Sequence, residues 1–344
     1  MIGPLPDFRA VSAGFVRASE FLPGLWRFRL PVARPEVKQV NAYAIEQEDG
    51  LMLIDCGVGG DETCWQALVA ALALAGFVPA DVRALVATHA HPDHMGLAEP
   101  LIAASGCTFH LHPDHAHLYN AFRNPAVVGA ARRGRARREG VPEDELDLYG
   151  DMSEETDAIS GAPDPDELLV DGICLTSGLG ELRVLETPGH APSHVALYAP
   201  AHRILFSADL VYTWFGPYFD YGLTPNPVAE FLASLDRIEA LDVVTALPGH
   251  GSPIEDLASA VAAHRAGIEQ RLAAVEAALR GVAPCRAFDL RQRVFGAPPT
   301  APIGVWQLAE VLAYLRHLRL AGAVVRDEDG DGVFRYRMAS SASE

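Results

Sequence analysis

Two short stretches of the chain combine histidine and aspartate at spacings suited to metal binding. The first, "ATHAHPDHMG", runs from Ala87 to Gly96, and the second, "FHLHPDHAH", runs from Phe109 to His117. Both contain the pattern His-x-His-Pro-Asp-His. Imidazole nitrogens and carboxylate oxygens at this density suit Zn, with Fe or Mn as further options. The repetition raises the question of which copy binds metal.

The first copy offers four candidate ligands: His89, His91, Asp93 and His94. If His89 and His91 end a strand, they point to the same face, because side chains alternate along a strand. Pro92 then turns the chain before the next two ligands. A tetrahedral ion with an open position needs only three protein ligands. The four are therefore better suited to two ions that receive further ligands from elsewhere.

Three further candidate ligands follow apolar runs elsewhere in the chain. "LRVLETPGH" leads to His190, "RILFSADL" contains Asp209, and "VVTALPGHG" contains His250. Each comes just after a predicted strand, and open α/β sheets place their sites at the carboxyl ends of strands. We therefore expect these residues to join the first copy.

Strands and helices alternate through most of the chain, which indicates an α/β fold with helices covering the sheets. We expect strands over residues 40–45, 51–55, 168–175, 182–186, 195–198 and 203–207, with another before each histidine copy. "PVAEFLASLDRIEAL" predicts an amphipathic helix. Residues 118–156 are helical in pattern, charged and poor in β-branched residues. We interpret them as an insertion that forms a cap or lid.

After about residue 260 the pattern is helical until Leu320, and it ends in "GAVVRDEDGDGVFRYRM", which predicts a hairpin. We expect a catalytic domain over residues 1–260 and a small winged-helix-like domain over residues 261–344. "DEDGDG" matches the start of a calcium loop, but Met338 stands where an EF-hand needs Glu. A hairpin turn is the better interpretation, and its acidic character argues against DNA binding.

The composition is that of a globular protein, with 344 residues, 49% hydrophobic and 21% charged. Lys and Arg total 27 against 45 Asp and Glu, and the net charge of −18 disfavours nucleic acid as a partner. Five scattered cysteines favour reduced thiols and a cytoplasmic location. The first residues have no signal-peptide pattern, and no apolar run is long enough to span a membrane. The oligomeric state stays open, with a homodimer among the options.

Five stretches in this order resemble the five motifs of the metallo-β-lactamase superfamily: "LIDCG", "THAHPDHMG", "TPGHAPSH", "FSADL" and "LPGHG". The match extends from about Val40 to Pro253. The resemblance implies an αββα sandwich with a binuclear metal site at one edge. It places the first ion on His89, His91 and His190, and the second on Asp93, His94 and His250. It further implies that Asp209 bridges the two ions and that Asp55 orients a ligand.

By this resemblance the first histidine copy holds the metal, because the distant ligands complete it and Asp55 precedes it by one helix. In the second copy, residues 110–115 are predicted to end a strand and start a helix. Pro113 is at the first helical position and Asp114 is in the first turn. His112 or His115 is left as a possible neighbour of the pocket.

Departures from known subfamilies narrow the activity that the resemblance implies. True β-lactamases of this fold lack a residue like Asp209, and flavo-diiron enzymes have Glu in place of His91. The glyoxalase II pattern has a second glycine where this chain has Leu97. RNA-processing members carry a long insertion before the last histidine, which the sequence does not show. The C-terminal region resembles that of β-lactamase-like hydrolases, a group that includes thioesterases and an endoribonuclease.

The resemblance therefore implies a hydrolase that cleaves a thioester or ester of a small acyl substrate with a hydroxide bridging two zinc ions. Asp93 would orient the hydroxide and carry a proton. An endoribonuclease acting on single-stranded RNA and a lactonase are the alternatives. Tyr212, three residues after Asp209, either donates to the substrate carbonyl, as in lactonases, or packs beside the site with Trp214 and Phe215. "VYTWFGPYFDYG" would line the acyl pocket.

A basic run in the expected insertion has two interpretations. Its members are Arg132, Arg133, Arg135, Arg137 and Arg138. They form either a solvated helix face that "EDELD" offsets, or an anchor for an anionic substrate tail.

Overall fold

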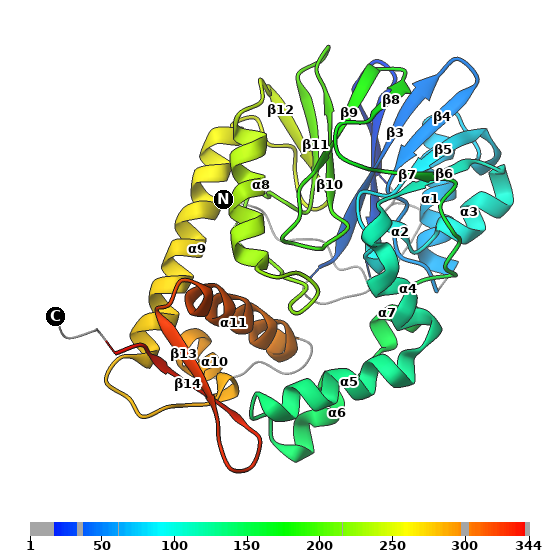
Figure 1. Ribbon diagram of the computed structural model, residues 1–344. Coiled ribbons are helices and arrows are strands. Elements are labelled where there is room, and N and C mark those ends of the chain that lie inside the picture. The colour runs from blue at the N-terminus through cyan, green and yellow to red at the C-terminus, as the bar shows by residue number, and fades with distance from the viewer. Residues whose placement is uncertain (1–16, 33–36, 61, 215, 297–302, 341–344) are drawn as a thin grey trace.

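The computed structural model describes residues 17–32, 37–60, 62–214, 216–296 and 303–340. Two β-sheets face each other, and helices cover the outer face of each sheet (Figure 1). Four layers in this order form the predicted αββα sandwich. The expectation about a signal peptide concerns residues 1–16, which lie outside the described residues.

The first sheet has seven strands in sequence order. They are β1 (Arg17–Leu22), β2 (Leu25–Pro31), β3 (Gln39–Gln47), β4 (Gly50–Ile54), β5 (Val82–Val86), β6 (Thr108–Leu111) and β7 (Glu167–Leu168). Strands β4 to β7 are parallel to one another, so their carboxyl ends meet at one edge. This edge is where the first histidine copy follows β5.

The second sheet has the order β12-β11-β10-β9-β8. Its strands are β8 (Cys174–Ser177), β9 (Gly180–Glu186), β10 (Val195–Ala199), β11 (Ile204–Ala208) and β12 (Thr245–Pro248). The strands β11 and β12 are parallel, so their carboxyl ends also lie at one edge.

Alternation of side chains along β3 explains how one strand serves two layers. Tyr43 and Ile45 point into the space between the sheets, whereas Ala42 and Ala44 point toward the outer helices. All four are buried. Near-continuous hydrophobic runs are therefore the expected pattern for these strands, because both of their faces are covered.

The predicted single strand over residues 168–175 is wrong. Leu168 pairs with Leu111 in the first sheet, whereas Leu175 pairs with Leu182 in the second. A turn at Asp171 and Gly172 separates the two short strands. Asp-Gly is a turn signal, and here it carries the chain from one sheet to the other.

Helices of three groups complete the fold. The first sheet is covered by α1 (Glu62–Leu74) and α3 (Ala98–Ser105), and the short α2 (Pro92–Met95) precedes α3. The second sheet is covered by α8 (Pro227–Glu239) and α9 (Leu257–Leu279). Residues 116–157 form α4 (Ala116–Arg123), α5 (Pro125–Arg138), α6 (Leu146–Tyr149) and α7 (Ser153–Asp157). They lie beyond the edge of the sandwich at which α2 is found (Figure 1).

The C-terminal region contains α10 (Ala287–Phe295), α11 (Ile303–Leu320) and the hairpin of β13 (Val324–Glu328) and β14 (Phe334–Met338). Its apolar residues share a core with the second sheet's helices: Leu235 of α8, Ile268 of α9 and Leu315 of α11 belong to one cluster. Residue 260, where we divided the chain, lies inside α9. The two-domain division and the winged-helix likeness stay predictions.

The "DEDGDG" stretch forms the turn of this hairpin, as the sequence predicted. The backbone N–H groups of Asp331 and Val333 donate to Asp329 Oδ1 at 3.1 and 2.9 Å. Asp329 is thus an acceptor within the turn. Among the described helices, none is both long and apolar enough to cross a membrane.

Candidate metal centre

Three histidines converge where β5 and β9 end. His89 Nε2 lies 3.0 Å from His91 Nδ1 and 3.3 Å from His190 Nε2, and the last two atoms are 3.0 Å apart. Ligands bound at 2.0–2.1 Å to a tetrahedral ion lie about 3.3–3.4 Å from one another. These three nitrogens therefore have nearly the spacing of ligands to one ion.

A second group forms beside them where α2 begins and β12 ends. His250 Nε2 lies 3.2 Å from Asp93 Oδ2, and His94 Nε2 lies 3.8 Å from the same oxygen. The ligand atoms of Asp93, His94 and His250 thus converge as the first three do. Gly249 permits this approach, because a Cβ atom there would lie 2.2 Å from Asp209 Oδ1 and 2.7 Å from His94 Cε1.

Asp209 lies between the two groups. Its Oδ2 is 3.6 Å from His190 Nε2 and 3.3 Å from His250 Nε2, and its Oδ1 is 3.4 Å from His94 Nε2. The backbone N–H of Asp209 donates to His194 Nε2 at 3.0 Å, which fixes the start of the loop after β11. This position suits a carboxylate that contacts ions in both groups.

Two buried polar atoms at the centre have no hydrogen-bond partner: His94 Nε2 and Asp209 Oδ1. Buried polar atoms are nearly always satisfied, so each such exception requires an explanation. A neutral imidazole nitrogen and a carboxylate oxygen are both acceptors, and a cation between them would satisfy both. The donor set of imidazoles and carboxylates therefore fits a transition-metal pair.

The charges around the centre support the same conclusion. Burial and the surrounding imidazoles hold the pKa of His89 well below its ordinary value, and burial lowers that of His190 to about 4. Burial also opposes the charged form of His94 and His250, but the nearby carboxylates outweigh it. They raise the pKa of His94 well above its ordinary value and that of His250 to about 10. His89 and His190 are thus neutral. Burial also opposes the charged form of His91, but the Asp220 and Asp93 carboxylates outweigh it and raise its pKa, so His91 and the second group favour positive charge.

The remaining ring nitrogen of each histidine has its own partner. These partners are Thr88 Oγ1 for His89, Asp220 Oδ2 for His91, Asp55 Oδ2 for His94, the Tyr218 carbonyl for His190 and the Gln39 carbonyl for His250, at 2.7–3.2 Å. Such contacts fix the tautomer and orientation of metal-binding histidines.

Asp55 lies where the sequence placed it, beside a predicted ligand. It accepts hydrogen bonds from the backbone N–H and hydroxyl of Thr88 at 2.8 and 2.9 Å, in addition to its contact with His94. Its φ of 58° is uncommon for a residue other than glycine. The backbone N–H of Asp55 donates to the Val86 carbonyl at 2.9 Å, which helps to hold this conformation.

Sequence reasoning missed Thr88, His194 and Asp220. Thr88 lies within the second motif, directly before His89, so its place at the strand end was available as a signal. His194 follows His190 by four residues, within the third motif. Asp220 comes from the loop between β11 and α8, and no spacing in the sequence connects it to His91.

The second histidine copy lies mostly apart from this centre. His112 Nε2 is 3.3 Å from Glu186 Oε1, and His115 Nδ1 is 2.7 Å from the His112 carbonyl oxygen. His117 is the member that reaches the site, with Nε2 3.6 Å from Asp220 Oδ2. The expected strand end and helix start are present in β6 and the short turn Pro113–His115.

Tyr212 lies at the rim of the second group. Its ring stacks on Trp214 with centroids 5.0 Å apart, and it lies 6.0 Å from the His250 ring. Burial and the Asp209 carboxylate raise the pKa of Tyr212 well above its ordinary value. The hydroxyl therefore stays protonated and able to donate. Phe215, which was expected beside it, lies outside the described residues.

Four of the five arginines of the basic run on α5 contact other residues of the protein. Arg132 pairs with Glu155, Arg137 with Glu143 and Arg138 with Glu328. Arg135 Nη1 donates to the Tyr221 carbonyl at 2.9 Å. The pair of Arg137 with Glu143 is the offset by "EDELD" that the first interpretation predicted.

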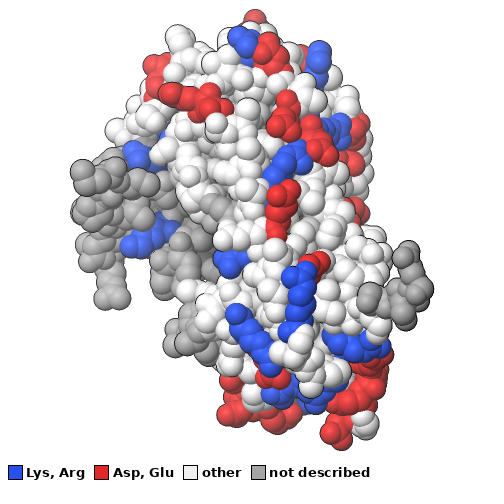
Figure 2. All heavy atoms as spheres, turned by 90° about the vertical axis from the view of Figure 1, so that its left-hand side faces the viewer, with Lys and Arg blue, Asp and Glu red and all other residues white. Residues whose placement is uncertain are grey.

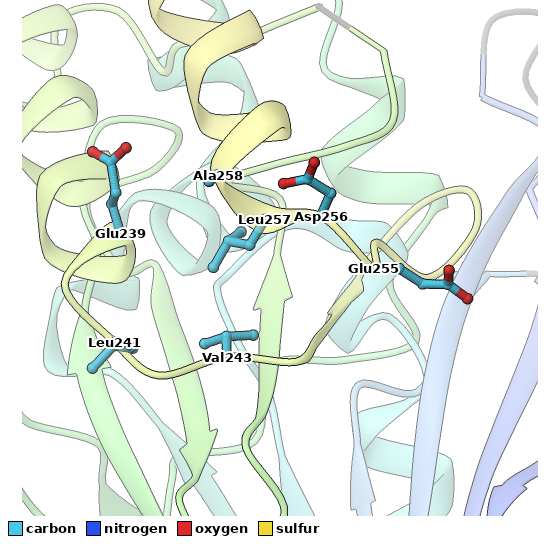
Figure 3. Close-up of a pocket in the computed structure, with 7 residues that line it drawn as sticks. All are labelled: Glu239, Leu241, Val243, Glu255, Asp256, Leu257 and Ala258. Carbon is cyan, nitrogen blue, oxygen red and sulfur yellow. The ribbon is translucent and has the colours of Figure 1, made fainter.

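A separate hollow lies near the start of α9, at the loop from α8 to β12 (Figure 3). It is lined by Glu239, Leu241, Val243, Glu255, Asp256, Leu257 and Ala258. Asp256 accepts a hydrogen bond from the backbone N–H of Ser259 and thereby caps α9. None of the converging histidines and aspartates lines this hollow.

Comparisons with known proteins agree with the geometry. The sequence pattern of the metallo-beta-lactamase superfamily matches residues 35–250. The crystal structure of a metallo-beta-lactamase family protein from Thermus thermophilus is similar, with a TM-score of 0.80 and 30% identity. The similarity covers 93% of this chain and 100% of that one.

Two curated relatives are more distant. A linear primary-alkylsulfatase from Pseudomonas sp. is 26% identical over 228 residues, which is 61% of this chain and 41% of the relative. An acyl-coenzyme A thioesterase, MBLAC2, from Gallus gallus is 29% identical over 174 residues, which is 48% of this chain and 55% of the relative. The chain thus spans about half the length of these relatives. The match over residues 35–250 shows that the chain belongs to the metallo-β-lactamase superfamily.

Proposed function

We propose that this protein is a binuclear metal hydrolase that cleaves a thioester or ester bond in a small acyl substrate. The observation that carries the proposal is the convergence of two ligand groups around one carboxylate, that of Asp209. The thioesterase relative supports the choice of bond.

We propose zinc as the metal, with iron or manganese as alternatives, because imidazole and carboxylate ligands accept all three. The first ion would be held by His89, His91 and His190, the second by Asp93, His94 and His250, with Asp209 between them. When bound, the ions lower the pKa of an attacking water to about 7 and polarise the carbonyl group.

Asp93 is suited to hold and move a proton. Burial favours its protonated form, but His94 and His250 outweigh this effect and keep the pKa of Asp93 well below its ordinary value. As a carboxylate whose side chain is 14% exposed, it can accept a hydrogen bond from the attacking water and orient it. Asp93 can then pass a proton toward the leaving group.

Tyr212 is suited to bind the substrate carbonyl. Its protonated hydroxyl lies in the electrostatic field of Asp209 and Asp93, beside the site of attack. A donor at this place would stabilise the negative charge that develops on the carbonyl oxygen. The same feature supports a lactonase as a second candidate, because a lactone carbonyl would be bound in the same way.

Aromatic side chains on both sides of the centre support an apolar acyl group. Trp214, 49% exposed, stacks on Tyr212 beside the second group. Tyr218 packs on His91 and His190, with ring centroids 5.8 and 5.7 Å apart. Trp306 of α11 packs on Tyr218 in turn, at 6.2 Å. Aromatic surfaces of this kind are the usual lining of a site for an apolar ligand.

We rank the ribonuclease alternative lower because the protein has a large net negative charge. The net charge is −18, and basic side chains lie among acidic ones over the lower part of the face in Figure 2. Single-stranded RNA binding instead requires a groove of basic and aromatic residues. We also keep a cytoplasmic location as a proposal, because the five cysteines, all within the described residues, form no disulfide.

An activity panel with metal analysis tests the proposal. The purified chain should contain about two metal ions and should hydrolyse acyl-coenzyme A or another thioester or ester faster than lactones or single-stranded RNA. His94→Ala should abolish this turnover, and His115→Ala should preserve it. Cleavage of RNA that depends on His94, without thioester or ester turnover, would reverse the ranking. Fast lactone turnover alone would favour the second candidate.

A further inference from the structure

Asp220 holds a predicted metal ligand from outside the ligand set. Its Oδ2 lies 2.9 Å from His91 Nε2, while His91 Nδ1 faces the other two histidines of its group. If Nδ1 binds an ion, Nε2 carries the ring proton and donates it to Asp220. The carboxylate would then fix the ring and make Nδ1 a stronger ligand.

Only two of the five histidines have a carboxylate in this role within the described chain. His91 of the first group has Asp220, and His94 of the second group has Asp55. The other three rings contact a hydroxyl or a backbone carbonyl instead. Each ion position therefore has one carboxylate–histidine pair, and Asp220 is the counterpart of Asp55.

The loop that carries Asp220 is held from two sides. The backbone N–H of Asp220 donates to the His190 carbonyl at 3.0 Å, so the loop also contacts a second ligand of the first group. On the other side, Arg135 Nη1 donates to the Tyr221 carbonyl at 2.9 Å, and its guanidinium lies 6.0 Å from the Tyr221 ring centroid. Gly222 accommodates Arg135, because a Cβ atom there would lie 2.7 Å from Nη1.

These contacts form one continuous path from α5 to the first ligand group: Arg135, Tyr221, Asp220 and His91. We propose that Asp220 and Arg135 are positioning residues through which the helical insertion sets the affinity of the first metal position. The inference rests on the proposed binuclear site, but it concerns residues that none of the superfamily motifs contains.

Zinc titration of the metal-free chain tests the proposal. Asp220→Asn should lower the affinity for one of the two zinc ions by about 10–100-fold, as substitution of other residues that orient a ligand does. The affinity for the other ion should stay within about threefold of the parent's. Arg135→Ala should lower the affinity for the same ion by roughly tenfold, and Arg135→Lys should restore part of this affinity. Arg137→Ala is the matched control, because Arg137 lies on the same helix and pairs with the exposed Glu143, so both affinities should be unchanged.

If Asp220 positions His91, zinc should be lost from the first position only. A variant that is destabilised as a whole would lose zinc from both positions. Anomalous diffraction at limiting zinc should show lower occupancy among His89, His91 and His190 in Asp220→Asn, and among Asp93, His94 and His250 in Asp55→Asn. Thermal unfolding of the metal-free variants should match that of the parent. Unchanged zinc affinity in Asp220→Asn, or a loss at the second position only, would overturn the inference. A parent chain that binds less than one zinc would instead overturn the proposed function.

Discussion

At the scale of single residues, the candidate centre pairs side chains that would bind the proposed ions with side chains that would orient these ligands. The first kind was predictable, because motifs quoted from the sequence contain every residue of the two converging groups. The second kind was predictable only in part: Asp55, which lies within the first motif, was identified, whereas Thr88 and His194, which also lie within motifs, were not. Asp220 could not be predicted, since its contact with His91 depends on how the loop after β11 folds back, which no local pattern encodes.

Tyr212 gives a residue-scale prediction that separates its two interpretations. Tyr212→Phe should lower kcat/KM by roughly 10²-fold with the metal content unchanged, because it removes a donor to the developing negative charge. The ring that stacks on Trp214 is kept. Steady-state kinetics with metal analysis measures this, and a packing role alone predicts activity equal to the parent's.

Gly249 gives a second prediction at this scale. Gly249→Ala should reduce the bound metal and the activity together, because the added methyl group would collide with Asp209 Oδ1 and His94 Cε1. Gly134→Ala is the control, since a Cβ atom at that helical position meets no neighbour within 4 Å. Metal analysis of both variants checks this, and full metal content in Gly249→Ala would contradict the geometry described.

At the scale of elements, most of the candidate ligands lie just after the ends of strands, whereas Asp93 and His94 lie on α2. The strands β3, β4, β9, β10 and β11 were predictable because apolar and β-branched runs end at clear turns. The split of β7 from β8 was missed because apolar residues on both sides of Asp171–Gly172 were taken as one strand, although Asp-Gly is a turn signal. Which strand joins which sheet depends on long-range pairing rather than on local pattern.

Trp306 of helix α11 is expected to influence which acyl chain lengths are preferred. Trp306→Ala should lower kcat/KM roughly tenfold more for long acyl chains than for short ones, because it removes the ring packed on Tyr218 beside the first group. Metal content should stay at the parent's value, and Trp306→Phe should restore part of the preference. A uniform loss across all chain lengths would argue that Trp306 acts only on stability.

At the scale of the whole molecule, the insertion and the C-terminal hairpin meet around a buried carboxyl group. Glu139 is 2% exposed and accepts a hydrogen bond from the Tyr336 hydroxyl at 2.9 Å. Burial raises the pKa of Glu139 from 4.5 to about 7, although Tyr336 and nearby arginines act in the opposite direction. The folded chain therefore holds a proton that the unfolded chain loses between these two pH values.

This difference predicts how stability depends on pH. Because the folded-state pKa is the higher one, Glu139 favours folding at low pH, and its contribution declines by roughly 3 kcal/mol as the pH rises from 4.5 to 7. Glu139→Gln should flatten this decline in the free energy of unfolding, measured with denaturant in excess chelator. Burial also raises the pKa of Glu310 to about 7, so Glu310 should account for a similar share of the decline in the free energy of unfolding. An unchanged slope in the double Gln variant would contradict this prediction.

Counting the metal ions bound by three chains shows whether the first histidine copy and its distant partners form one binuclear centre. We expect about two ions in the parent and in His112→Ala, and fewer in His91→Ala. His91 and His112 hold equivalent places in the two copies, so each variant is the control for the other. Less than one ion in the parent, or a loss in His112→Ala with none in His91→Ala, would contradict this expectation.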